Sequence, residues 1–106
     1  MFRGRNFLID VTPLKIIDDK TALGLWVELP ESPAPLVMII GRLGFVCCGF
    51  LNIEAAEKLN VAAAMVSGVK NFDDVLNAEV KSVTSKAQAL GVKTGIKGKD
   101  ASKLFL

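Results

Sequence analysis

The chain has 106 residues, and its 13 Lys and Arg residues against 11 Asp and Glu give a formal net charge of only +2. This length suits one domain with one core. The charge is too small to indicate nucleic-acid binding, which shows as a concentrated basic surface. We therefore expect residues 1–106 to form a single domain with no nucleic-acid partner.

The sequence contains neither histidine nor tyrosine. This excludes Ser-His-Asp and Cys-His catalysis within one chain, as well as zinc chemistry of the HExxH type. Two cysteines are too few for a structural zinc site within one chain. We expect no metal and no cofactor, and any catalysis would depend on Cys, Asp, Glu, Lys, Ser or Thr.

Charged residues interrupt every long apolar run, among them Arg42, Lys58 and Lys70. No run reaches the length of about 20 residues that a membrane-spanning helix needs. No signal-peptide stretch precedes Asp10. The sequence therefore predicts a cytoplasmic protein that is not bound to a membrane.

The first half of the chain has the pattern of an antiparallel meander. Strands are predicted at residues 7–17, 23–29, 36–40 and 45–49. Pro13 makes the first of these an edge or irregular strand, because proline has no N–H to donate. The second strand alternates, which predicts that Trp26 lies on a half-exposed face, opposite Leu25 and Val27. The third is apolar on both faces and is therefore a central strand.

The second half has mainly helical periodicity. Asn52, Asn71 and Thr84 are predicted to cap helices, and a last helix begins near Gly98. The alanines of residues 61–66 favour a helix, but the unbroken apolar run before Ser-Gly suits a buried strand, which we choose. The fold class is then α+β, with about five strands in one mixed, mostly antiparallel sheet and the helices packed mainly on one face.

Several segments, in this order, resemble the YunC-like family, a domain of unknown function found in archaea and bacteria. The segments are Cys48-Gly49-Phe50-Leu51-Asn52, residues 68–76, Val83-Thr84 with Ala89-Leu90-Gly91, and residues 95–101. The resemblance covers roughly residues 22–104 and implies a two-layer α/β sandwich without a settled activity. It implies a Cys-Gly pair, which matches Cys48 and Gly49, and it says little about the first twenty residues.

The predicted strand 45–49, helix 53–59 and strand 61–66 form a βαβ unit with parallel strands. Both strands then end at one edge of the sheet. Ligands of α/β sheets commonly bind at the carboxyl ends of the strands, and free amides at a helix N-terminus favour anions. Asp73 and Asp74 count against anion binding at the second helix, because their carboxylates can already satisfy its N-terminus. The predicted ligand-binding residues are Cys48, Gly49, Asn52, Ser67, Gly68 and Lys70.

Cys48 is also the candidate catalytic residue, since thiols near a helix N-terminus can be activated. The alternative is that Cys48 is a small buried hydrophobic residue, as free cysteines commonly are. Gly49 and Gly68 have a similar alternative, because both glycines could simply permit tight turns.

Three function classes follow, and the sequence leaves open whether the protein is an enzyme. The first is a binding or regulatory module for a small anionic metabolite, which we rank highest. The second is a thiol-dependent enzyme using Cys48, against which the missing histidine counts. The third is a structural or interaction protein.

The mean hydropathy of +0.42 is high for a small protein. We expect a homo-oligomer with a buried apolar interface to which Trp26 contributes, because a small monomer has little interior for so many apolar residues. A core rich in alanine and valine is the alternative explanation.

Overall fold

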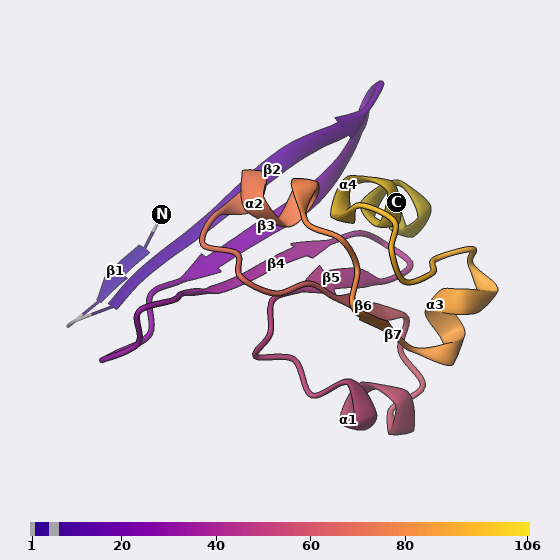
Figure 1. The fold of residues 1–106 in the computed structure, drawn as a ribbon. Coiled ribbons are helices and arrows are strands. Elements are labelled where there is room, and N and C mark those ends of the chain that lie inside the picture. Colours follow the sequence, from indigo (N-terminus) through magenta and orange to yellow (C-terminus); the bar gives the residue numbers. More distant parts are fainter. Residues whose placement is uncertain (1, 5–6) are drawn as a thin grey trace.

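The computed structural model describes residues 2–4 and 7–106 (Figure 1). Strands and helices follow one another much as the sequence predicts. The strands are β1 (Phe2–Gly4), β2 (Phe7–Ile17), β3 (Lys20–Val27), β4 (Leu36–Ile40), β5 (Phe45–Cys47), β6 (Ala63–Met65) and β7 (Ser82–Val83). The helices are α1 (Ile53–Lys58), α2 (Phe72–Asn77), α3 (Ser85–Ala89) and α4 (Gly98–Phe105).

Within the described residues, seven strands form one sheet in chain order, from β1 to β7. Every neighbouring pair is antiparallel except β5 and β6, which are parallel and joined through α1. The mixed, mostly antiparallel sheet confirms the α+β class, and the pairing of β5 with β6 confirms the βαβ unit. The sequence reading missed β1 and β7, which are the two edge strands.

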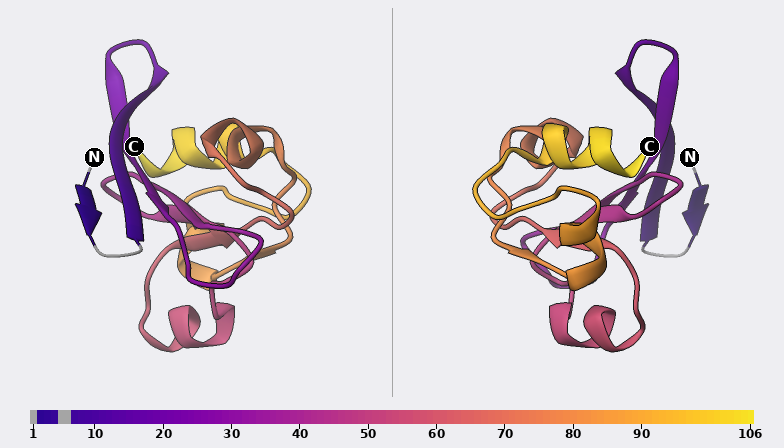
Figure 2. Two further views of the ribbon diagram at one scale, coloured as in Figure 1. Left: turned by 90° about the vertical axis from the view of Figure 1, so that its left-hand side faces the viewer. Right: turned by 90° about the vertical axis from the view of Figure 1, so that its right-hand side faces the viewer.

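Strands β2 and β3 form a long hairpin that extends beyond the rest of the sheet (Figures 1 and 2). Its turn contains Asp18, whose φ of 51° lies in the left-handed region. On its other side, β2 pairs with β1 only from Phe7 to Ile9. Pro13 therefore lies where β2 has one partner strand, which agrees with the predicted edge position.

One face of the sheet packs against α2 and α4 (Figure 2). Val37, Ile39 and Val46 point to this face and are 0–1% exposed. Gly24 lies there too, and a Cβ atom at this position would come within 2.8 Å of the Phe72 ring. The two helices therefore form the second layer of the structure, while α1 and α3 pack against β6.

The predicted caps start three helices. The Oδ1 atoms of Asn52 and Asn71 accept hydrogen bonds from the N–H groups of Ala55 and Asp74, at 3.0 and 2.8 Å. Thr84 Oγ1 accepts from Ala87 N at 3.3 Å. These bonds satisfy backbone donors that have no partner within the helix.

Trp26 lies on the side of the sheet that faces α2 and α4, and its side chain is half-buried, in agreement with the predicted half-exposed position. Its strand partner Val37 is fully buried on the helix-covered face. The indole Nε1 donates to Lys70 O at 2.9 Å, in the segment before α2. Leu25 and Val27 consequently point to the opposite face.

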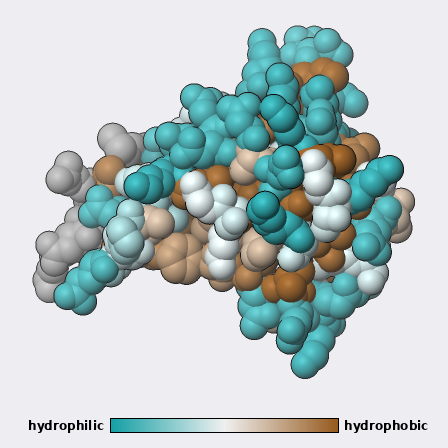
Figure 3. Space-filling view, viewed as in Figure 1, coloured by the Kyte–Doolittle hydropathy of each residue, from teal (hydrophilic) through white to brown (hydrophobic). Residues whose placement is uncertain are grey.

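Hydrophilic residues cover the end of the hairpin and the region of α1, with hydrophobic residues visible between them (Figure 3). Among the residues that the structure describes, no helix has the length and apolar character that crossing a membrane requires.

Candidate functional site

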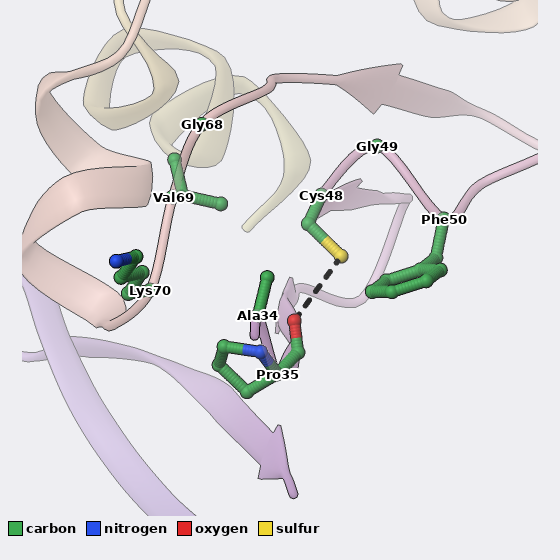
Figure 4. A pocket seen from close by; sticks show the side chains of 8 residues that line it. All are labelled: Ala34, Pro35, Cys48, Gly49, Phe50, Gly68, Val69 and Lys70. Atoms are coloured by element: carbon green, nitrogen blue, oxygen red, sulfur yellow. Dashed lines mark hydrogen bonds between the residues drawn. The ribbon is translucent and has the colours of Figure 1, made fainter. Parts of the chain in front are cut away.

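A cavity of about 260 Å³ lies at the edge of the sheet where β5 ends. Three segments form its wall: the residues before β4, those after β5, and those between β6 and α2 (Figure 4). The lining residues are Ala34, Pro35, Cys48, Gly49, Phe50, Gly68, Val69 and Lys70.

The first wall is a tight turn that follows β5. Cys48 N donates to Val37 O at 3.0 Å, which continues the pairing with β4, and Leu51 N donates to Cys48 O at 3.1 Å. Between these bonds, Gly49 and Phe50 are exposed, and Phe50 retains 54% of its accessible surface. A large aromatic side chain therefore stands at the cavity mouth.

The second wall is the segment that leads from β6 to α2. Gly68 has a φ of 71°, a conformation that glycine adopts without steric cost. At Lys70 the backbone is held on both sides, because its N–H donates to Asp74 Oδ2 at 3.0 Å and its carbonyl accepts from Trp26. The Lys70 side chain itself is exposed. The fold thus fixes the position of the Lys70 backbone, from which the side chain extends.

The third wall, Ala34 and Pro35, is joined to the first through the Cys48 thiol. Val37 N donates to Cys48 Sγ at 3.4 Å, and Sγ lies 4.0 Å from Pro35 O, at the limit for a hydrogen bond from sulfur (Figure 4). Cys48 is only 3% exposed. The thiol therefore connects two walls and has little contact with solvent.

Glycine leaves open space at two points of the lining. A Cβ atom at Gly49 or at Gly68 would meet no heavy atom within 4 Å. Glycine here exposes backbone that a side chain would cover, which lets a small molecule approach the main chain.

The structure brings four of the six predicted ligand-binding residues together around this cavity: Cys48, Gly49, Gly68 and Lys70. Asn52 and Ser67 are outside its lining, and the Asn52 oxygen is engaged in capping α1. Sequence reasoning missed the other four lining residues, Ala34, Pro35, Phe50 and Val69. Phe50 could have been found, since it directly follows Cys48-Gly49 in the segment that carries the family resemblance.

Among the described residues of the lining, Lys70 alone carries a charge. Pro35, Phe50 and Val69 supply apolar surface. The adjacent Cys47 lies outside the lining, and burial, followed by the neighbouring Cys48 thiol, raises the pKa of its thiol to about 12. Cys47 is therefore protonated at neutral pH and offers no thiolate to a ligand or substrate.

The chain is an α+β protein with a small cavity at one edge of a mixed sheet. Residues 47–104 match the family described as a domain of unknown function (DUF1805), and the chain belongs to this family. The matched segment includes the first and second walls of the cavity.

Two relatives extend the likeness to nearly the whole chain. The chain is 28% identical to the uncharacterized protein YunC of Bacillus subtilis (strain 168) over 98 residues, which are 89% of this chain and 94% of YunC. It is also 28% identical to a protein of unknown function from Thermoplasma acidophilum, whose crystal structure superposes with a TM-score of 0.88 over 99% of this chain and 100% of that one. The resemblance to the YunC-like family is thus confirmed, and neither relative's description gives an activity.

Proposed function

We propose that this single-domain, cytoplasmic protein is a homo-oligomeric binding or regulatory module that holds a small anionic metabolite in the cavity beside Lys70. The cavity's composition carries the proposal: one lysine stands beside apolar walls, and two glycines leave the backbone open. Ligand sites are commonly concave and apolar, with a few polar groups that fix orientation.

The walls favour an anion that has a compact apolar part. Pro35, Phe50 and Val69 offer contact to hydrocarbon, while the ammonium group of Lys70 attracts a carboxylate or phosphate. Apolar walls exclude water, which strengthens the attraction between opposite charges. The volume of about 260 Å³ is near the lower end of ligand cavities, roughly 300–1,000 Å³. The site is therefore suited to a ligand of a few heavy atoms.

The preference for an anion depends on the Lys70 side chain and not on helix amides. Asn52 and Asn71 cap α1 and α2, and Asp74 accepts from the N–H of Lys70. These donors are already satisfied, so they add little for an incoming anion. Removing the charge of Lys70 should accordingly remove most of the selectivity.

Binding is favoured over catalysis by the environment of Cys48. Its thiol is buried and bridges backbone groups of β4 and the preceding loop. Iodoacetamide at neutral pH separates the alternatives, because a packed thiol reacts only after unfolding, whereas a nucleophile reacts in the folded protein. Rapid modification of Cys48 in the folded protein would favour the thiol-dependent enzyme.

An NMR titration of ¹⁵N-labelled protein with isobutyrate tests the site. We expect shifts concentrated at the amides of Gly49, Gly68 and Lys70, and a weaker response to the neutral isostere isobutyramide. Lys70→Gln should weaken isobutyrate binding at least about tenfold, the equivalent of about 1.4 kcal/mol. Lys93→Gln, at an exposed lysine outside the lining, is the matched control. Equal binding to wild type and Lys70→Gln would contradict the proposal, as would the absence of shifts with isobutyrate and inorganic phosphate alike.

A further inference from the structure

The sheet has an apolar face on the side opposite α2 and α4. Strand pairing places Ile9 beside Val27, Val11 beside Leu25, and Leu23 beside Ile40, so these side chains point to the same side. We call this surface the open face and define it by Ile9, Val11, Leu23, Leu25, Val27 and Ile40.

The open face is not part of the buried core. Its six defining residues are neither in the core cluster of the described residues nor packed against it. Val11 and Leu23 keep 48% and 42% of their accessible surface, and the other four are half-buried. No helix of the described chain makes a substantial contact with β2, β3 or β4 from this side, because α2 and α4 lie on the other.

In the β2 segment of residues 9–12, the apolar residues all lie on the open face. Over residues 9–12 the strand alternates Ile9, Asp10, Val11 and Thr12. Asp10 and Thr12 are on the side of α2 and α4, where Thr12 donates a hydrogen bond to Asp10. An antiparallel sheet with one solvated face normally carries polar residues there. Over residues 9–12 the apolar residues instead point to the side without helices, as expected for a face that another surface covers.

We propose that a second copy of this chain covers the open face, so that two sheets pack face to face in a two-fold symmetric dimer. This inference rests on the homo-oligomer of the proposed function and identifies its interface. Sheets pack in this way at a separation of about 10 Å, with their apolar side chains interdigitated. A two-fold interface uses the same patch on both copies, and an apolar patch is complementary to itself.

Charge supports a copy of the same chain. Among the described residues of β2, β3 and β4, one charged side chain, that of Lys15, lies on the same side of the sheet as the open face. Its strand partner is Thr21, near the end of the hairpin. Two open faces can therefore meet without burying like charges in the middle of the contact. Burying such charges without partners would cost several kcal/mol.

The size of the open face is sufficient for a weak dimer. The three strands β2, β3 and β4 at a spacing of about 4.8 Å and the eight residues of β3 at about 3.4 Å each give a field of about 14 by 27 Å. Two such flat fields together bury about 800 Å², which is in the size range of weak or transient interfaces. The dimer should therefore dissociate on dilution through the micromolar range.

Sedimentation velocity of the full chain from 1 to 200 μM tests the proposal. We expect wild type to pass from one chain to two over this range. Val11→Glu and Leu23→Glu should each raise the dissociation constant at least about 100-fold, because every substitution places an unpaired charge in the contact twice. Both positions are exposed in one chain, so the variants should fold, which circular dichroism checks.

Leu104→Glu is the matched control, since Leu104 is 39% exposed and lies on α4, which packs on the side of the sheet opposite the open face. It should dimerise like wild type. A monomer at 200 μM would overturn the proposed dimer and the homo-oligomer together. An oligomer that survives Val11→Glu and Leu23→Glu would overturn only this interface. The isobutyrate titration reports the cavity separately, so the failure of either proposal is distinguishable from that of the other.

Discussion

Cys48 and Val37 are joined twice: Cys48 N donates to Val37 O at 3.0 Å, and Val37 N donates to Cys48 Sγ at 3.4 Å. The second bond replaces a backbone bond with a side-chain bond, just beyond the last residue of β5. It holds the turn with Gly49 and Phe50 against the loop that ends at Pro35. Two walls of the cavity thus depend on one sulfur atom.

Cys48→Ala should lower the free energy of unfolding by about 1–3 kcal/mol, because the fully buried Val37 N–H would lose its acceptor. Urea denaturation measures the change. Cys48→Ser keeps an acceptor at this position and should lose less than the alanine variant. If the two variants are equally stable, the Val37–Cys48 bond contributes nothing to stability.

Cys47 should make stability fall at alkaline pH. Burial and the neighbouring Cys48 raise its pKa from 9.0 to about 12 in the folded protein. Above pH 9 the unfolded chain therefore releases a proton that the folded chain retains. The contribution of Cys47 is present below pH 9 and is lost as pH rises from 9 towards 12, by at most about 1.4 kcal/mol per pH unit.

Cys47→Ala isolates this effect, since both proteins share the titration of their lysines. Urea denaturation at pH 8 and at pH 10.5 should show the advantage of wild type over the variant shrinking at the higher pH. An advantage of the same size at both pH values would mean that the folded protein does not hold the Cys47 proton more tightly than the unfolded chain does.

Much of the fold follows from local signals in the sequence. Asn52, Asn71 and Thr84 start helices because their side chains can satisfy neighbouring amides, which requires no knowledge of distant contacts. By contrast, β7 has only two residues, and no pattern in so short a segment marks a strand. Its pairing is set by β6, a neighbour in space.

The orientation of Trp26 was not predictable from alternation alone. A strand pattern divides residues between two faces but does not say which face a helix covers. Here both faces of β3 carry apolar residues, so the choice depends on α2, nearly fifty residues later. The third cavity wall has the same origin: Pro35 reaches Cys48 because β4 pairs with β5 through Met38 and Cys47.

Two glycines of the cavity should respond differently to the same substitution. Gly68→Ala should cost about 1–2 kcal/mol, because an L side chain is strained at a φ of 71°. Gly49→Ala meets open space without such a φ and should change stability by less than about 0.5 kcal/mol. Thermal melts of both variants test the difference, and equal destabilisation would contradict the turn geometry at Gly68.

Thr84 should contribute more to stability than a helix cap alone. Its hydroxyl accepts from Ala63 N at 3.0 Å, donates to Val61 O at 2.7 Å, and accepts from Ala87 N, in a residue that is 1% exposed. It therefore links the start of α3 to the beginning of β6. Thr84→Val keeps the shape of the side chain but removes every one of these bonds, and should cost at least about 3 kcal/mol.

The matched variant is Thr84→Ser, which keeps the hydroxyl and deletes one methyl group, at a cost of about 1 kcal/mol. Urea denaturation compares the two, and hydrogen exchange should show the Ala63 amide losing protection in Thr84→Val but not in Thr84→Ser. A valine variant as stable as the serine variant would show that methyl packing, and not the hydroxyl, holds α3 against β6.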